Sequence, residues 1–188
     1  MLTEKSLHHF TDHVASQGHA MAGATIAASA ALACSLGQAL LRINVPLVPR
    51  PDADLATRLA GQLVDARDRL LALTNEDGDA ITAFAALRAA GKTLAGQERL
   101  CQMPVEMARL AIAAAALLQQ FRPFIVQAQD DLEMAITLLA GAGRAAILLL
   151  DSNLRLWPDP PLLAQFEPEL AALRAEIGRV HPVERIRP

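Results

Sequence analysis

Aromatic side chains are scarce in this sequence, and their scarcity limits what the core can be made of. Phe and Trp together supply 3% of the 188 residues, and Tyr is absent. Hydrophobic residues nevertheless reach 53%, so Ala and Leu must fill the interior. Small side chains let helices approach closely, which favours a tightly packed bundle. Because each small residue buries little apolar area, we also expect a homo-oligomer whose interface adds to the core.

Basic patches, paired cysteines and metal-binding spacings are also missing. The net charge is −3, and Lys and Arg do not cluster beside aromatics, which argues against nucleic acid as a partner. Cys34 and Cys101 stand alone and are expected to be buried thiols of a reducing, cytoplasmic compartment. His9 and His13 share a helix face without a third ligand nearby, so no metal is expected. The sequence contains neither a Ser-His-Asp set nor a phosphate loop.

One long uncharged stretch, Ala20 to Leu41, raises the question of a membrane span. Ala, Gly, Ser and Thr dominate it, and these residues gain little in hydrocarbon compared with Leu or Ile. No basic segment precedes it, and Asp12 lies where a signal peptide would have one. We therefore expect no membrane contact and a central bundle helix that is buried nearly all round from Ala27 to Leu41.

Helical periodicity runs through the chain, and no convincing strand pattern accompanies it. Thr3 is a plausible first N-cap, three prolines predict an extended connection over residues 44–54, and Pro104 predicts a break within a later helix. These signals predict an all-α antiparallel helical bundle with an additional short C-terminal helix, as one domain over residues 1–188. The expected helices cover residues 3–17, 25–43, 55–90, 94–120, 130–153 and 162–178.

Two stretches near helix ends are candidates for chemistry. Small residues from Gly18 to Thr25 leave backbone N–H groups at a helix start open to an anion or a carbonyl oxygen, although a plain loop with a Thr cap explains them equally. Glu76, Asp77 and Asp79 lie late on a helix, where carboxylates oppose the macrodipole. Neighbouring carboxylates raise each other's pKa, which suits proton transfer. A solvated turn around Gly78 is the alternative.

Polar residues also flank the fifth expected helix. Asp130 and Asp131 stand at its start, where N-capping explains at least one of them without any function. Asn153 closes the same helix after a run of Ile and Leu, where a polar residue can simply mark the point at which the helix leaves the core. Each position therefore has both a structural and a functional interpretation.

In chain order these features resemble the cyclodeaminase/cyclohydrolase family. The family includes the cyclodeaminase half of formiminotransferase-cyclodeaminase and stand-alone bacterial methenyltetrahydrofolate cyclohydrolases. Its Pro-Gly-Gly-Gly-Ser/Thr loop corresponds to Met21-Ala22-Gly23-Ala24-Thr25, which keeps one glycine. Its acidic stretch resembles Glu76-Asp77-Gly78-Asp79-Ala80-Ile81, and its Leu-Pro-Lys-Gly-Thr becomes Ala89-Ala90-Gly91-Lys92-Thr93. Its Val-Pro, Ser-Asp and Asn-Val-x-Ile-Asn-Leu motifs become Met103-Pro104-Val105, Asp130-Asp131-Leu132 and Leu149-Leu150-Asp151-Ser152-Asn153-Leu154.

The resemblance spans about Leu7 to Pro158 and implies a dimerising helical bundle with a folate site at or near the subunit interface. It implies a cyclodeaminase, which expels ammonia from 5-formiminotetrahydrofolate, or a cyclohydrolase, which opens methenyltetrahydrofolate with water. The implied substrate is a derivative of tetrahydrofolate or of a related pterin carrier, and no cofactor is implied. The implied catalytic residues are Asp77 and Asp131, and the implied substrate-binding residues are Gly23, Thr25, Lys92 and Asn153.

The altered glycine loop keeps a second interpretation open. Alanine at positions 22 and 24 places methyl groups where backbone would approach a ligand. The alternative is a non-catalytic or repurposed bundle that binds a ligand or a protein partner. If the enzyme interpretation is right, the loop Gly23–Thr25 should converge with Asp77 and Asp131 on one cleft.

Overall fold

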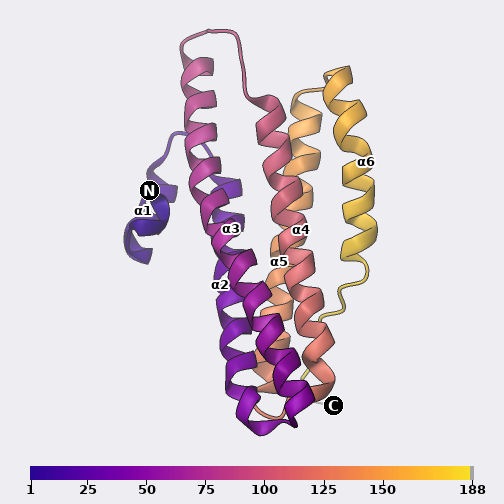
Figure 1. Ribbon diagram of the computed structural model, residues 1–188. Coiled ribbons are helices and arrows are strands. Elements are labelled where there is room, and N and C mark those ends of the chain that lie inside the picture. Colours follow the sequence, from indigo (N-terminus) through magenta and orange to yellow (C-terminus); the bar gives the residue numbers. More distant parts are fainter. Residues whose placement is uncertain (187–188) are drawn as a thin grey trace.

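The structure is a computed structural model that describes residues 1–186, and within this range it contains helices and turns but no strand (Figure 1). Three short 3-10 turns connect or precede the α-helices: η1 (Leu2–Glu4), η2 (Val45–Leu47) and η3 (Arg122–Phe124). The predicted all-α fold is confirmed. The helices are α1 (Leu7–Ser16), α2 (Ala22–Asn44), α3 (Arg50–Ala89), α4 (Gln97–Phe121), α5 (Gln129–Leu156) and α6 (Pro160–Ile177).

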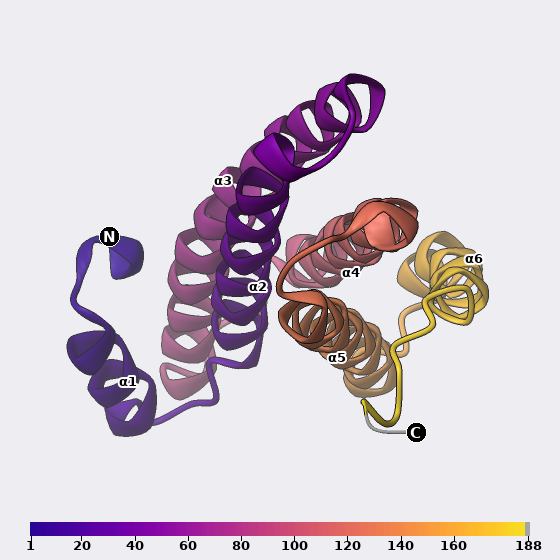
Figure 2. The same ribbon diagram turned by 90° about the horizontal axis from the view of Figure 1, so that it is seen from below.

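Four long helices, α2 to α5, form the bundle, and helices that follow each other along the chain run antiparallel (Figure 1). Seen along the bundle, α2 lies beside α3 and α5, while α6 covers α4 and α5 from outside (Figure 2). Helix α1 stands apart from the bundle in the same view and buries none of its residues. The apolar side chains of α1 therefore contribute nothing to the buried core, and Leu7 is 68% exposed.

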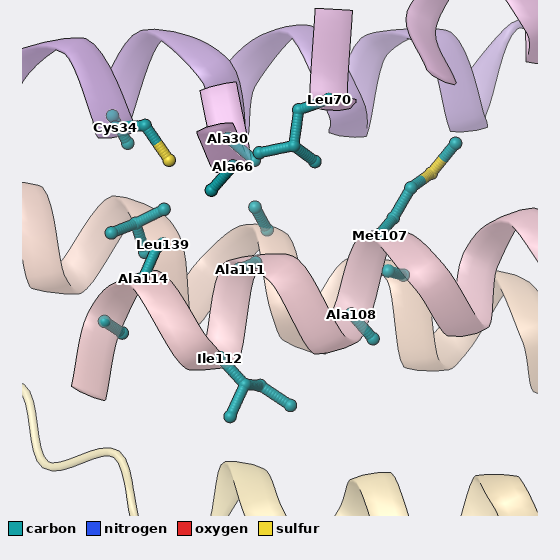
Figure 3. Packing of buried hydrophobic residues seen from close by; sticks show 14 of the residues in the cluster. Ala30, Cys34, Ala66, Leu70, Met107, Ala108, Ala111, Ile112, Ala114 and Leu139 are labelled. Carbon is teal, nitrogen blue, oxygen red and sulfur yellow. The ribbon is translucent and has the colours of Figure 1, made fainter. Parts of the chain in front are cut away.

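The core is built mainly from alanine and aliphatic side chains, as the lack of aromatics predicts. Ala30 of α2 and Ala66 of α3 face Ala111 of α4, and all three are buried (Figure 3). Ile112 points from the other side of α4 toward α6. Small residues at these contacts allow the close helix approach that the composition predicts.

Both cysteines are buried free thiols, as predicted. Burial raises the pKa of Cys34 to about 12 and the pKa of Cys101 to about 11. A thiol with such a high pKa is a poor nucleophile at neutral pH, because only the thiolate attacks.

Several predicted helix boundaries are wrong, because the residues that begin the helices are not those that periodicity indicates. Helix α1 begins after Ser6, whose Oγ accepts the N–H of His9 at 3.2 Å, rather than after Thr3. Residues 44–54 are mostly helical, because α3 begins at Arg50 and Pro51 occupies its first turn, where no N–H is needed. No side chain caps α5, since the residue before it, Ala128, adopts a left-handed conformation at φ 59°. The expectation that Asp130 or Asp131 caps this helix is therefore also wrong.

Helix α2 is not buried all round, which corrects another expectation. A line of its residues at helical spacing faces outward, and Leu32 on this line is 62% exposed. Helix α5 packs beside α2 and presents a similar line, on which Leu148 is 65% exposed. The exposed and half-buried apolar residues of the two lines are called the α2/α5 face below. They are Leu32, Leu36, Ile43, Met134, Leu138 and Leu148.

Three segments of the described chain are long and apolar enough to cross a membrane, judged by length and composition alone. They are Ala22–Leu47, Gln97–Phe124 and Gln129–Leu156. Within the window that defines each one, 50%, 61% and 56% of the residues are buried inside the structure. Half or more of the residues in these windows therefore lie inside the bundle itself.

Candidate functional site

The site begins where Asp77 of α3 meets the first turn of α2. Oδ2 of Asp77 accepts the backbone N–H of Ala24 at 2.8 Å, and the residue is only 4% exposed. The first N–H groups of a helix have no partner within the helix, and a carboxylate there also complements the helix dipole. Asp77 therefore caps α2 from a neighbouring helix, which explains why α2 begins at Ala22 rather than at Thr25.

Gly23 is required at this contact, because the Asp77 carboxylate lies directly on its backbone. A Cβ built on Gly23 would be 2.1 Å from Oδ1 of Asp77 and 2.4 Å from its Cγ, well inside contact distance. The flanking Ala22 and Ala24 carry their methyl groups without displacing the carboxylate. The single glycine that this loop retains is thus the one that the Asp77 contact needs.

Burial, rather than neighbouring carboxylates, raises the pKa of Asp77 above its usual range. The hydrogen bond from Ala24 opposes that rise without cancelling it. Asp79 is exposed, and the pKa of Glu76 is lowered, first by its hydrogen bond with Arg69. The expectation that the acidic neighbours raise the pKa of Asp77 is therefore wrong, although the raised pKa itself is found.

Glu76 belongs to a separate group of ion pairs between α3 and α4. Arg69 contacts Glu76 at 2.5 Å and Glu106 at 2.6 Å, and Arg99 also pairs with Glu76. These side chains are about a third exposed, so the pairs fix the relative position of α3 and α4 more than they stabilise the fold. The two adjacent acids of α3 therefore serve different partners: Glu76 faces α4 and Asp77 faces α2.

Asn153 enters the site from α5 and satisfies a carbonyl that a proline leaves without a partner. Pro104 lies inside α4 and has no N–H to offer to the carbonyl of Leu100, four residues earlier. Nδ2 of Asn153 donates to this Leu100 oxygen at 2.8 Å. Helix α4 consequently runs through Pro104 without the predicted break.

Two connected cavities lie between these residues and solvent. The inner one, called the chamber, has a volume of about 40 Å³, and Gly23, Asp77, Leu149 and Asn153 are among its lining residues. The outer one, called the cleft, has a volume of about 950 Å³ and lies between the loop before α2, the end of α3 and the end of α5. Ala20, Ile81, Asn153 and Trp157 line both cavities, so the chamber adjoins the cleft.

The walls of the cleft combine aromatic rings with positive charge. The rings of Phe84 and Trp157 have centroids 5.1 Å apart, and His19 and Arg88 also line the cleft. Such an arrangement suits a planar ligand that carries an anionic group. Among residues 1–186, no group of three His, Cys, Asp or Glu side chains could hold a metal ion.

A family model described as formiminotransferase-cyclodeaminase matches residues 6–172. The chain belongs to the formiminotransferase-cyclodeaminase family. This membership confirms the resemblance and places the chain in a folate-related one-carbon family. The match includes both cavities and most of α6. No curated protein matches the chain.

The structure brings together three of the site residues that the family resemblance implies, and it places two others elsewhere. Gly23, Asp77 and Asn153 line the chamber. Thr25 is exposed on the outside of α2, where its hydroxyl donates to the Met21 carbonyl at 2.9 Å. Lys92 is exposed in the loop after α3 and does not line the cleft.

Asp131, the second implied catalytic residue, lies at the far end of the bundle. It is exposed in the first turn of α5, whereas Asn153 lies 22 positions later in the same helix. At 1.5 Å per residue this separation is about 33 Å. The predicted convergence of Asp131 with Gly23 and Asp77 in one subunit is therefore wrong.

Arg88 and the two aromatic residues of the cleft are members of this site that the sequence analysis missed. Asp77, Ile81, Phe84 and Arg88 are spaced four, three and four residues apart, so they lie on one face of α3. This spacing could have identified Phe84 and Arg88 from the sequence, because residues three or four positions apart lie on the same helix face as the candidate carboxylate Asp77. Trp157 ends α5 four residues after Asn153, which is the same helical spacing.

Proposed function

We propose that this protein is a cytoplasmic enzyme that acts on a tetrahydrofolate derivative bound in the cleft, as a methenyltetrahydrofolate cyclohydrolase or a formiminotetrahydrofolate cyclodeaminase. One observation carries this proposal. A buried carboxylate with a raised pKa, Asp77, lines the small chamber that adjoins a cleft large enough for a folate. Family membership supplies the substrate class.

The cleft offers separate contacts to the two ends of such a substrate. The pterin ring can stack against Trp157 and Phe84, since a conjugated ring packs favourably on an aromatic face. Arg88, on the same face of α3 but three turns from Asp77, can pair with a carboxylate of the glutamate tail. This role replaces the one that the family resemblance implies for Lys92.

Asp77 would carry out the proton transfers. Both reactions pass through a carbon bonded to two nitrogens that bears positive charge, and a nearby carboxylate stabilises that charge. A carboxyl group whose pKa lies closer to neutrality than usual gives and takes protons more effectively at physiological pH. The burial that raises the pKa of Asp77 therefore suits either reaction.

The test is an assay of Asp77→Asn beside Asp79→Asn, an exposed carboxylate two positions away that does not line the cleft. Methenyltetrahydrofolate consumption is followed by its near-ultraviolet absorbance, and binding by the fluorescence of Trp157, the one tryptophan. We expect Asp77→Asn to lower turnover by about 100-fold or more with similar binding, and Asp79→Asn to behave as wild type. A wild-type rate equal to that of buffer, or an active Asp77→Asn variant, would contradict the proposal.

A second candidate is a family relative that binds a ligand or a protein partner without catalysis. It is favoured by the capping bond between Asp77 and Ala24, because this structural role alone would explain a buried aspartate. The two candidates differ in one measurement. A non-catalytic relative binds the folate, with quenching of Trp157, but its turnover does not exceed the buffer rate.

We also propose that the protein is a homodimer that associates through the α2/α5 face. Helix α2 has 23 residues and is about 34 Å long. Two helices side by side at about 10 Å spacing therefore present roughly 700 Å². This area is close to the roughly 800 Å² that each partner of a stable complex buries. All six side chains of the face are uncharged, so a second copy of the same face is a suitable partner.

Light scattering with matched variants tests the dimer. Wild type should be a dimer of the 20.0 kDa chain. Leu148→Arg places a charge in the α2/α5 face and should yield monomers, whereas Leu7→Arg on α1 carries the same change outside the face. A monomeric wild type would contradict the proposal. Recovery of wild type in a membrane fraction that only detergent extracts would show that lipid covers the face instead.

A further inference from the structure

The chamber is too small for any part of a folate, and its size limits what it can hold. Its volume is about 40 Å³, against about 950 Å³ for the cleft into which it opens. A site of about 10–15 Å³ measured in this way can hold one water molecule. The chamber therefore admits one or a few molecules with a single heavy atom and excludes rings and amino acids.

The polar groups of the chamber determine the chemistry of its guest. Asp77 and Asn153 are each more than nine-tenths buried, at 4% and 9% exposure. Asp77 uses one oxygen to accept from Ala24, and an ionised carboxylate retains further acceptor sites. Asn153 donates its amide N–H to Leu100, so among the described residues its amide oxygen is left as an acceptor without a partner. Both polar side chains of the chamber accept hydrogen bonds, so a molecule that pairs with both must donate at least two hydrogen bonds.

We propose that the chamber holds the one-heavy-atom reactant of the enzyme, a small neutral hydride of oxygen or nitrogen: water as the nucleophile, or ammonia as the leaving group. This inference rests on the proposed function, which places the reactive carbon of the folate in the adjoining cleft. A guest that donates its hydrogens to Asp77 and Asn153 turns its lone pair toward that carbon. The aliphatic side chains of the chamber, including Ile81, Leu100 and Leu149, offer a guest no polar contact.

For hydrolysis, the oxygen of the chamber water bonds to the methenyl carbon while Asp77 takes one proton from it. The bond from that carbon to N5 then breaks, N5 receives the proton from Asp77, and the remaining hydroxyl proton leaves to solvent as 10-formyltetrahydrofolate forms. In the deamination, N10 bonds to the formimino carbon and loses its proton. The bond from that carbon to the formimino nitrogen breaks, and the nitrogen gains the proton that N10 loses and a second proton from the carboxylic acid of Asp77, which regains it from solvent. Ammonia then departs into the chamber.

Leu149 and Leu156 provide a matched pair of substitutions, because Leu149 lines only the chamber and Leu156 lines only the cleft. Leu149→Phe should fill the chamber and lower kcat by about 100-fold, while methenyltetrahydrofolate binding, read from Trp157 fluorescence, changes less than about twofold. Leu156→Phe should change binding instead. If Leu149→Phe retains the wild-type kcat, the chamber proposal is wrong although the proposed function stands.

A second measurement uses the size of the reactant and does not depend on the filled variant. Methenyltetrahydrofolate is incubated with wild type in ammonium or methylammonium buffer, and amine adducts are identified by mass spectrometry above the uncatalysed rate. A chamber for ammonia gives the formimino adduct but no methylamine adduct, and Leu149→Ala, which enlarges the chamber, admits methylamine. A chamber that takes water alone gives no adduct, and ammonium then leaves the rate of hydrolysis unchanged. Equal use of both amines by wild type overturns the assignment, and no wild-type turnover at all overturns the proposed function with it.

Discussion

Replacing Gly23 with alanine tests the contact on which the site is built. The added Cβ would lie 2.1 Å from Oδ1 of Asp77 and 2.6 Å from Oδ2, so the carboxylate must move away. Its hydrogen bond with the Ala24 N–H, now 2.8 Å long, would then be lost. The first turn of α2 would keep an unpaired N–H in a buried position.

Two opposing effects determine the magnitude. Losing a hydrogen bond to a charged group costs about 1.5–3 kcal/mol. Alanine is favoured over glycine within a helix by about 0.5–1 kcal/mol. The net effect of Gly23→Ala is therefore a destabilisation of roughly 0.5–2.5 kcal/mol. The sign is opposite to that expected at an unconstrained helical glycine.

Gly61 of α3 supplies the control, because a Cβ built there meets nothing within 4 Å. Denaturant titration should show Gly61→Ala more stable than wild type by about 0.5–1 kcal/mol and Gly23→Ala less stable. In an Asp77→Ala background the obstructing atoms are absent, so Gly23→Ala should become neutral or stabilising. If Gly23→Ala stabilises the protein as much as Gly61→Ala does while Asp77 is intact, the proposed contact between Gly23 and Asp77 is refuted.

Three further measurements address the remaining polar contacts. Because burial raises the pKa of Asp77, its contribution to stability is present below about pH 4 and is lost as pH rises toward its folded pKa. The free energy of unfolding, measured between pH 3 and 8, should therefore fall as pH rises, and Asp77→Asn should remove this pH dependence. Asn153→Ala should lower the free energy of unfolding by about 1–3 kcal/mol, measured by denaturant titration. The loss should be clearly smaller in a Pro104→Ala background, where the backbone of α4 can supply the N–H for the Leu100 carbonyl. Arg122 pairs with the buried Glu133, so Arg122→Met should lower the free energy of unfolding by about 3 kcal/mol, because it leaves the carboxylate unpaired. A second change, Glu133→Leu, should recover most of that loss. Full stability of the single variant would show that the pair contributes nothing.

The fold could be predicted from sequence because helical periodicity is a local property. The 40-residue α3 was expected nearly to its end, including its passage through Gly78. Gly78 is accommodated because α3 meets other parts of the chain there: a Cβ would lie 2.5 Å from a methyl group of Leu2. The start of α2 could not be predicted in the same way, because its cap, Asp77, is 53 residues away in sequence.

The site was predictable only where local sequence determines both partners. Gly23 and Asp77 follow from motifs, but the failure of Asp131 depends on how long α5 is and which way it runs past α2. A motif order shared with a family does not say which end of a helix faces the site. The position of Lys92 has a similar origin, because the loop after α3 carries it away from the cleft while Arg88 remains on the helix face.

The long-range cap of α2 links the order of folding to the formation of the site. The Ala24 N–H has its partner only after α3 has folded back along α2 and brought Asp77 to it. A nascent chain that ends before Asp77 can form most of α2, but its first turn should fray. The Asp77 carboxylate is therefore never present at the site without the helix start that it caps. Any change that opens the α2–α3 hairpin should remove activity and protection of the Ala24 amide from hydrogen exchange together.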